Sequence, residues 1–248
     1  MNQEQAEEEF LANYDPSNYP HLGFTVDNVI FTVHDGQLKV LLIQRGEHPH
    51  KGQWALPGGF ISPDEDADTA ALRELHEETG VDGSGLFLEQ LRTYTAPGRD
   101  PRMRVISTAY VALIPQALTV QGGDDAANAA WFTVNDILNP TDEDDRITVA
   151  FDHAQIITDG VERVRSKLEY QPVATSLLGE QFTIADLRRI YEVVWGKPLH
   201  PANFRRKVLT TDGFVVPLGV RGSSVTGGNS ASLYKRGDCE LLHPAILR

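Results

Sequence analysis

Strand-like patterns of apolar residues fill the first half of this 248-residue chain. Residues 24–33 and 38–44 are rich in β-branched and large apolar side chains, which favour strands. Asp35 and Gly36 lie between them and are a strong turn signal, so the two stretches are predicted to form a β-hairpin. Similar patterns predict three further strands at 86–94, 105–114 and 130–134. The first half of the chain therefore predicts a sheet.

Helical spacing of apolar residues dominates the second half. Apolar residues recur every three or four positions over residues 150–168, which predicts a long amphipathic helix. Thr183 is a suitable N-cap for a helix over 184–195. A turn at 196–198 and a second predicted helix over 201–209 follow.

These patterns divide the chain into four parts. Residues 1–22 are acidic and then turn-like, which predicts an N-terminal arm with a short surface helix. Residues 23–170 hold the strands and the long helix, and 171–181 form a linker with a proline and few charges. Residues 182–248 form a second, smaller domain. The expected fold class is α+β.

The composition is that of an ordinary globular protein, with 41% apolar residues, 21 Gly and 14 Pro. Cys239 is the one cysteine, which excludes a disulfide within the chain. No apolar run of 18 residues and no signal peptide are found, so we expect no membrane partner and a cytoplasmic location.

The charge is unevenly distributed. The net charge is −13, but residues 1–170 hold 12 basic and 29 acidic side chains, a net charge of −17. Residues 171–248 hold 10 basic and 6 acidic side chains, a net charge of +4. This division indicates two domains with different partners, and it makes the second domain the candidate for a polyanion surface.

The segment from Gly59 to Val81 is predicted to be a glycine loop followed by a helix. Asp64, Asp66 or Asp68 is placed to cap the helix, and Gly80 to end it.

Three glutamates on this helix, Glu74, Glu77 and Glu78, fall within an arc of roughly 100°. The neighbouring arc carries three residues expected to face the core: Ala71, Leu72 and Leu75. Carboxylates this close repel one another, which Arg73 and a divalent cation would offset. Mg²⁺ suits a site made of oxygen ligands and shared with phosphates. Three glutamates alone equally describe a solvated acidic helix face.

The complete segment resembles the Nudix box, Gly-x5-Glu-x7-Arg-Glu-apolar-x-Glu-Glu-x-Gly-apolar. Every fixed place is filled: Gly59, Glu65, Arg73, Glu74, Leu75, Glu77, Glu78, Gly80 and Val81. The resemblance implies an α/β/α sandwich with a mixed sheet, and a loop–helix–loop that binds a diphosphate and Mg²⁺, with Mn²⁺ as an alternative. The implied metal site is formed by Gly59, Glu65, Glu74, Glu77 and Glu78, and Arg73 orients the acids. The implied reaction is metal-assisted attack of water on a substituted nucleoside diphosphate.

Four arginines near this segment are candidates for binding an anionic ligand: Arg45, Arg99, Arg102 and Arg104. Arg45 ends the predicted hairpin, where it could reach a phosphate or be a solvated strand end. The other three lie in a loop with proline and glycine, which predicts an anion clamp. The alternative is a basic loop that balances the acidic domain.

Two other features allow more than one interpretation. The acidic run Asp142–Asp145 is typical of a solvated helix N-terminus, and the sharper alternative is that it supplies a general base. His153 lies at the start of the predicted long helix, where a lone histidine is more often structural than catalytic.

The second domain has the pattern of a winged helix-turn-helix. Its second helix carries Arg205, Arg206 and Lys207 in a row. Residues 214–218 and 232–236 are predicted to pair as a hairpin around a Gly/Ser-rich loop that carries Arg221. The alternative is a module for dimerisation or packing.

A second resemblance covers nearly the whole chain. Six segments look like those of the Nudix-related transcriptional regulators of NAD metabolism, the NrtR family: Tyr14-Asp15, Arg99-Asp-Pro-Arg102, 151–153, 182–192, 203–207 and Leu233-Tyr234. The resemblance implies a homodimer with an ADP-ribose-binding Nudix domain and a DNA-binding winged helix. The implied DNA-binding residues are Asn203, Arg205, Arg206, Lys207, Arg221 and Lys235. Of these, Arg205 and Arg206 would read guanine edges or phosphates, and Lys207 would contact a phosphate. The stretch 221–230 is long for the family's wing.

Three functional hypotheses follow. The first is a repressor of NAD metabolism genes that binds operator DNA and senses ADP-ribose or a related dinucleotide. The second is an ADP-ribose pyrophosphatase that gives AMP and ribose 5-phosphate. The third combines both activities. The basic helix has no role in a plain hydrolase, so the regulator is preferred, with hydrolysis kept open by the complete set of acids.

Overall fold

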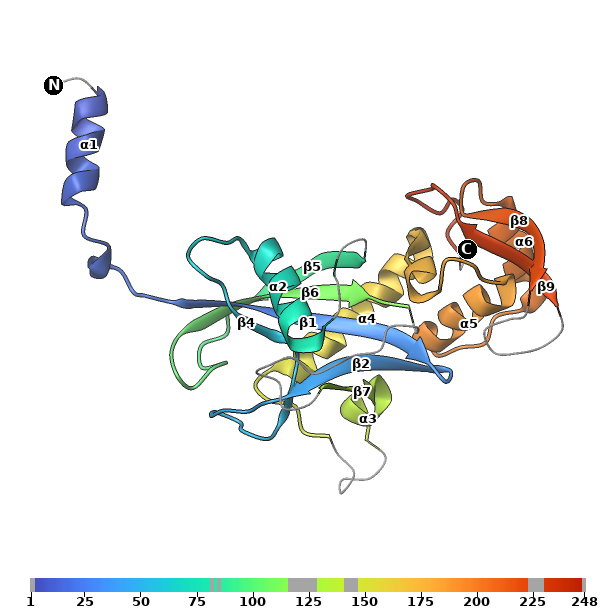
Figure 1. Ribbon diagram of the computed structural model, residues 1–248, viewed down its shortest axis with the longest axis horizontal. Helices are drawn as coiled ribbons and strands as arrows, with labels where there is room; N and C mark the ends of the chain where they lie inside the picture. Colours follow the sequence, from blue (N-terminus) through green and yellow to red (C-terminus); the bar gives the residue numbers. More distant parts are fainter. Residues whose placement is uncertain are drawn as a thin grey trace.

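The computed structural model describes residues 3–80, 83, 86–115, 129–140, 147–222 and 230–246. A mixed sheet forms the body of the molecule, and a small helical unit with a hairpin lies at one end (Figure 1). The strands of the sheet are β1 Gly23–His34, β2 Gln37–Gln44, β3 Trp54–Ala55, β4 Gly58–Phe60, β5 Phe87–Tyr94, β6 Val105–Leu113 and β7 Ala129–Thr133. The helices of the body are α2 Ala67–Thr79, α3 Val134–Leu138 and α4 His153–Tyr170.

Strand β1 is central in the sheet, whose order is β3–β2–β1–β6–β5. It pairs parallel with β6 and antiparallel with β2 and β4, and β7 pairs with the other edge of β2. Asp35 and Gly36 form the turn between β1 and β2 with φ values of 50° and 73°. The predicted hairpin is therefore confirmed, and the mixed sheet expected for a Nudix fold is present.

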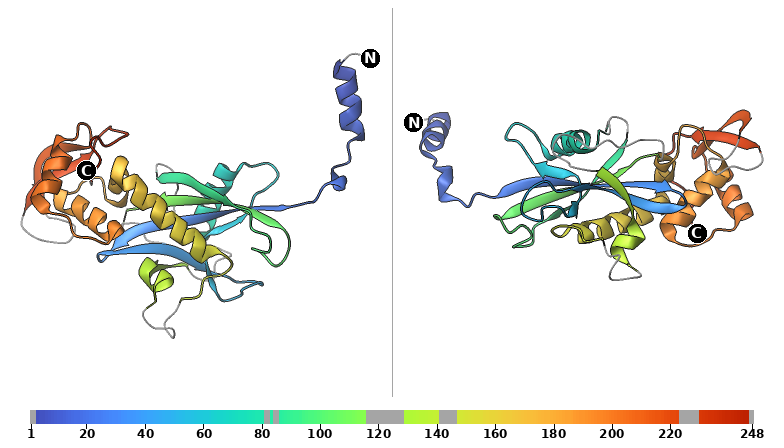
Figure 2. Two further views of the ribbon diagram at one scale, coloured as in Figure 1. Left: turned by 180° about the vertical axis from the view of Figure 1, so that it is seen from behind. Right: turned by 60° about the horizontal axis from the view of Figure 1, so that its bottom comes forward.

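Alternating side chains of β1 enter two separate layers. Ile30 packs with Leu75 of α2, whereas Val29 and Phe31 belong to the larger core that includes α4. Figure 2 shows α2 and α4 on opposite faces of the sheet. A Cβ atom at Gly160 of α4 would lie 3.1 Å from Val29 and 3.2 Å from Phe31, so glycine allows the helix to approach β1 closely. This is the expected α/β/α sandwich.

Helix α2 is rotated slightly from the predicted orientation. Ala70, Ala71 and Leu75 are fully buried, but Leu72, which we expected to face the core, is 39% exposed. The side chain of Leu72 lies against Gly83 instead.

The second domain is built on two helices and a hairpin, as predicted. Its elements are α5 Ile184–Trp195, α6 Pro201–Thr210, β8 Val215–Gly222 and β9 Ala231–Arg236. Thr183 and Asp186 form a reciprocal capping box at the start of α5, and Gly196 ends it with φ 66°. Tyr191 of α5 and Phe204 of α6 pack with ring centroids 5.3 Å apart, so an aromatic core joins the two helices.

The segment between the domains is packed rather than extended. Residues Pro172–Leu177 form a 3-10 helix, η2, with five buried residues in contact with α4 and α5. By contrast, the arm at the other end lies away from the body: α1 Gln3–Asn13 and the 3-10 helix η1 Pro16–Asn18 have no buried residue (Figure 1). None of the helices in the described ranges has the length and apolar character needed to cross a bilayer.

Candidate functional site

A cavity of about 340 Å³ opens beside the loop that precedes α2. Its walls come from β1, the end of β2, β4, the loop between β5 and β6, and the start of α4. Among the sequence-predicted residues, Arg45, Gly59, Glu78, Arg99 and Arg102 line it. The topology therefore brings together residues that lie more than 50 positions apart.

Arg73 organises the acidic helix from one side. Its guanidinium donates to both carboxylate oxygens of Glu65, at 2.5 and 3.0 Å. It also donates to Glu74 at 2.8 Å and to Glu77 at 2.9 Å. The hydrogen bonds from Arg73 lower the pKa of Glu65 to about 2. One cation thus contacts three carboxylates, and the orienting role that the Nudix resemblance implies for it stays a prediction.

Helix α2 is set in place by its ends. Of the three predicted caps, Asp66 is the N-cap, and its carboxylate accepts a hydrogen bond from the Thr69 amide at 2.8 Å. Gly80 closes the helix with φ 70°. A Cβ atom at Gly59 would lie 2.3 Å from a carboxylate oxygen of Glu74, so the glycine makes room for that acid.

Two carboxylates of α2 are poorly solvated. Glu78 accepts a hydrogen bond from the Gly58 amide at 2.6 Å, and burial raises its pKa to about 8, with the nearby Glu74 and Asp27 adding to the effect. Glu74 is 8% exposed, and burial raises its pKa as well, against the opposing effect of Arg73. Desolvated acids of this kind are costly when ionised, unless a cation lies close to them.

These acids have the chemistry that a divalent cation needs, but the described side chains alone do not form a complete metal site. Nudix proteins generally use divalent metals, and the oxygen donors of Glu74 and Glu78 are the ligands that such hard cations prefer. Within the described ranges, no three His, Cys, Asp or Glu side chains converge as a complete metal cage. Phosphate oxygens and water would therefore have to complete the coordination shell.

Two arginines of the loop between β5 and β6 are paired with carboxylates. Arg99 is 6% exposed and donates to Asp152 at 2.7 and 3.0 Å and to Asp27 at 3.3 Å. Arg102 makes two hydrogen bonds to Asp100, at 2.7 and 3.1 Å. Carboxylates therefore pair with both guanidinium groups, and the anion clamp of three arginines stays a prediction.

The other two predicted ligand arginines have separate surroundings. Arg45 lies 4.8 Å from the ring centroid of Phe151 and donates to the carbonyl of Pro49 at 2.8 Å, at the cavity wall. Arg104 does not line the cavity, and its backbone carbonyl accepts a hydrogen bond from Gly23.

A polar network around Asp27 at the cavity wall was not predicted from the sequence. Asp27 accepts a hydrogen bond from Ser107 at 2.5 Å and lies 3.5 Å from Nε2 of His153. Nδ1 of His153 accepts from the Leu56 amide at 2.8 Å, and burial lowers the pKa of this histidine. The signal for Asp27 was present, since it is the one acid in a largely apolar strand.

The predicted DNA-binding residues are mostly exposed. Asn203, Arg205 and Arg206 project from α6, while Phe204 and Val208 of the same helix are buried. Arg221 and Lys235 are exposed on the β8–β9 hairpin, and Arg221 donates to the carbonyl of Ser230 at 2.5 Å.

Lys207 has partners within the protein. Its ammonium donates to the backbone carbonyls of Ala245 and Ile246, at 3.1 and 2.8 Å, and its contact with a DNA phosphate stays a prediction. Three predicted features lie outside the described residues: Val81, the acidic run 142–145 and the loop 223–229 between β8 and β9.

The fold and the site define a Nudix domain joined to a winged helix domain. Residues 24–151 match the NUDIX domain family, and residues 174–235 match the NrtR DNA-binding winged helix domain.

Three similar proteins agree with this division. The ADPR responsive transcriptional repressor NtrR of Acinetobacter baylyi is 34% identical over 93% of this chain and 88% of its own length. Shewanella oneidensis NrtR complexed with a 27mer DNA superposes with a TM-score of 0.72 at 33% identity, covering 89% of this chain and 99% of that chain. An ADP-ribose pyrophosphatase of Methanocaldococcus jannaschii is 37% identical over 57% of this chain and 74% of its own length. The chain belongs to the NrtR family of Nudix-related transcriptional regulators.

Proposed function

We propose that this protein is a transcriptional repressor of NAD metabolism genes that responds to ADP-ribose or a related NAD-derived dinucleotide. One observation carries the proposal: a single chain holds a carboxylate-lined Nudix cavity and, at the far end, a helix with exposed Asn203, Arg205 and Arg206. Residues 23–170 form the sensing domain and 182–248 the DNA-binding domain. The protein acts where its operator lies, in the cytoplasm.

The ligand binds through its diphosphate together with a divalent cation, Mg²⁺ or alternatively Mn²⁺. Carboxylate oxygens of Glu74 and Glu78 would hold the cation, with Glu77 as a further ligand once it exchanges Arg73 for the metal. The cation neutralises phosphate charge when bound. Arg45 and Arg102 lie at the cavity wall on the ligand side, and the aromatic faces beneath them, Phe151 and Phe60, give the nucleoside an apolar surface.

Operator DNA binds to the opposite end of the molecule. Helix α6 enters the major groove, where Arg205 and Arg206 read guanine edges or contact phosphates, and Asn203 contacts the neighbouring base. Arg221 and Lys235 follow the backbone from the wing. A homodimer places two such helices on two half-sites. The solved complex of Shewanella oneidensis NrtR with a 27mer DNA supports DNA as the partner.

Repression then depends on linkage between the two sites. A ligand that weakens DNA binding must itself bind more weakly to the DNA complex by the same factor.

Hydrolysis of ADP-ribose to AMP and ribose 5-phosphate is a second candidate activity. The complete set of acids, Glu65, Glu74, Glu77 and Glu78, and the pyrophosphatase of Methanocaldococcus jannaschii favour it. Turnover also needs a general base and a substrate pose that places water for attack.

A single titration tests both activities. Fluorescence anisotropy would follow binding to DNA from upstream of the neighbouring genes, with and without ADP-ribose and Mg²⁺, while AMP is measured in the same samples. We expect specific binding that ADP-ribose relieves. Rapid AMP release without specific DNA binding at moderate salt would reject the repressor and support the hydrolase.

A further inference from the structure

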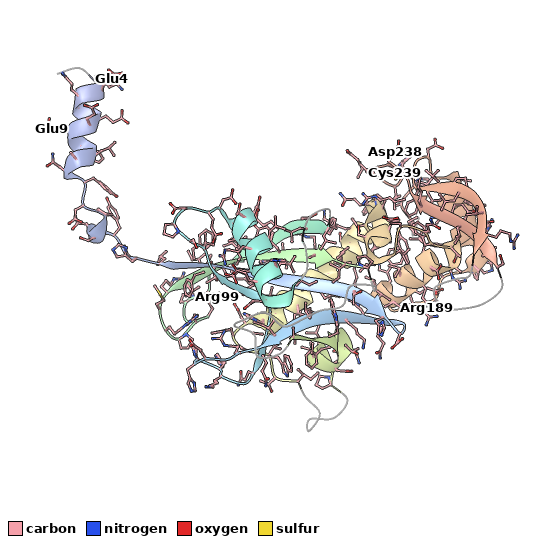
Figure 3. The ribbon with its side chains drawn as sticks, viewed as in Figure 1. Glu4, Glu9, Arg99, Arg189, Asp238 and Cys239 are labelled. Carbon is pink, nitrogen blue, oxygen red and sulfur yellow. The ribbon has the colours of Figure 1, made fainter. Side chains whose placement is uncertain are left out.

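Helix α4 begins at the ligand cavity. Its N-cap residue, Asp152, holds Arg99 through two hydrogen bonds of 2.7 and 3.0 Å, and Figure 3 shows Arg99 at this end of the sheet. The first helical residue, His153, lines the cavity and accepts a hydrogen bond from the Leu56 amide. A ligand that engages Arg99 or displaces it from Asp152 therefore acts directly on the start of α4.

The same helix is stiff and reaches the other domain. It has 18 residues, and at 1.5 Å per residue it spans about 27 Å. Seven of its residues are buried, from His153 to Leu168, so the helix packs against the core along its length. Near its end, Nε of Arg165 donates to the Val194 carbonyl at 2.9 Å, and Nε1 of Trp195 donates to the Arg165 carbonyl at 3.1 Å.

The last carbonyls of α4 bind a short segment that follows the wing. We call residues 242–246 the tail segment. The Leu242 amide donates to the Tyr170 carbonyl at 2.7 Å, and the Ile246 amide donates to the Glu169 carbonyl at 3.1 Å. Carbonyls in the last turn of a helix have no partner within the helix, so the tail segment satisfies groups that would otherwise need water.

The tail segment also contacts α6, the helix proposed to enter the major groove and called the recognition helix below. The Lys207 ammonium on α6 donates to the Ala245 and Ile246 carbonyls at 3.1 and 2.8 Å. Leu242, Ala245 and Ile246 are 3%, 7% and 5% exposed, so the segment is part of the core and not a loose end. Partial burial also lowers the pKa of Lys207, with the neighbouring Arg206 adding to the effect.

We propose that the tail segment couples the ligand cavity to the recognition helix, with Lys207 as a positioning residue rather than a phosphate contact. The chain of contacts runs from Arg99 to Asp152, along α4 to Glu169 and Tyr170, and through the tail segment to Lys207. A shift at the start of α4 then changes the angle of α6. This inference rests on the proposed function, because it needs a ligand response and a DNA affinity to connect.

Lys207→Met provides the first test, because it keeps the stem of the side chain and removes the ammonium. Operator affinity would be measured with and without ADP-ribose, and ADP-ribose affinity would be measured on its own. Couplings of this kind are typically about 5- to 150-fold. The ratio of operator affinity without ADP-ribose to operator affinity with ADP-ribose measures the coupling. In Lys207→Met we expect this ratio to fall to about 2 or less, with unchanged ADP-ribose affinity.

A phosphate contact by Lys207 would give a different result. If Lys207 contacts a phosphate, Lys207→Met weakens operator binding, reduces the slope of log K against log salt by about 0.9, and keeps the ratio at its wild-type value. A wild-type ratio in this variant overturns the proposal. Arg206→Gln is the matched control: an exposed neighbour on α6, it should weaken operator binding while the ratio stays as in the wild type.

A second variant separates the tail segment from the lysine. A chain that stops after Leu241 keeps Lys207 but lacks its carbonyl partners, and we expect the same loss of the ratio. Should either variant fail to fold, hydrogen exchange of the Leu242 and Ile246 amides in the wild type replaces it. Exchange that accelerates severalfold when ADP-ribose binds supports the coupling, and unchanged exchange contradicts it. A wild-type protein that ignores ADP-ribose would instead reject the proposed function itself.

Discussion

Helices α2 and α6 each carry a cluster of charges, but the two clusters are built in opposite ways. On α2, Arg73 is bound to three carboxylates and Glu74 is 8% exposed. On α6, Arg205 and Arg206 are exposed, and the described residues offer them no ion pair. The charges of α2 are therefore held in place by the protein, whereas those of α6 face solvent.

The proposed function accounts for the difference. A small ligand with a metal needs fixed donors in a site with little water, where misplaced charge is costly. DNA offers a long row of phosphates, so exposed and adaptable cations are sufficient, and each contributes a salt-dependent share. Burial of the charged side chains thus distinguishes a preorganised site from a surface suited to a polyanion.

The largest effect is expected from Glu78→Gln, which breaks the preorganised side of this comparison. Loss of one carboxylate ligand should lower metal-dependent hydrolysis of ADP-ribose by about 100-fold or more, which corresponds to about 2.7 kcal/mol in the barrier. AMP release under saturating Mg²⁺ measures it. Glu180→Gln, at an exposed position, is the control and should keep wild-type turnover. Unchanged turnover in Glu78→Gln, in a wild type that hydrolyses ADP-ribose, would reject the metal-site assignment.

The pH dependence of the free energy of unfolding tests the carboxylate of Glu78 without any substrate. In the metal-free folded protein Glu78 keeps its proton up to a pKa of about 8, whereas in the unfolded chain it loses the proton near its ordinary value of 4.5. Between these values the unfolded state binds fewer protons, so the contribution of Glu78 to stability falls as pH rises from about 4.5 to 8. Urea unfolding at several pH values should show a decline that Glu78→Gln removes. A decline of equal size in that variant would assign it to other groups.

Arg205→Ala disturbs the exposed side of the comparison, and its expected effect is intermediate. Removal of a base or phosphate contact should weaken operator binding by about 1–3 kcal/mol, because water replaces only part of the lost interaction. Anisotropy titrations at fixed salt measure this loss, and ADP-ribose affinity should stay the same. Lys51→Ala, an exposed cation of the Nudix domain, should leave operator affinity unaltered. Equal affinity in Arg205→Ala and the wild type would mean that α6 is not the recognition helix.

The smallest effect is expected from Asp66→Ala, which changes how α2 is held but none of its charged ligands. Loss of the cap to the Thr69 amide should lower the free energy of unfolding by about 1 kcal/mol. Denaturant unfolding measures this change. Asp64→Ala is the matched control two residues away and should have no effect, since Asp66 is the residue that caps the helix. Equal losses in both variants would point to a general effect of acidic charge near the helix start.

Much of this protein was determined by local sequence. The hairpin of β1 and β2 follows from two β-branched stretches around Asp35-Gly36, and the start of α5 follows from the capping box of Thr183 and Asp186. The Nudix box fixed the positions of Glu74 and Glu78 on one helix, because a spacing of four residues returns to the same face. These features depend on neighbours within a few residues, which a sequence pattern records directly.

The tertiary structure alone decided which charges remain available. Arg99 was expected to bind a ligand phosphate, but it meets Asp27 and Asp152, which lie 72 and 53 residues away in sequence. Lys207 was expected to contact DNA, but it meets carbonyls 38 and 39 residues further on. Such partners are brought together only when the sheet and α4 assemble. A basic residue has the same side chain in either environment, so its sequence neighbourhood could not show which of the two it would occupy.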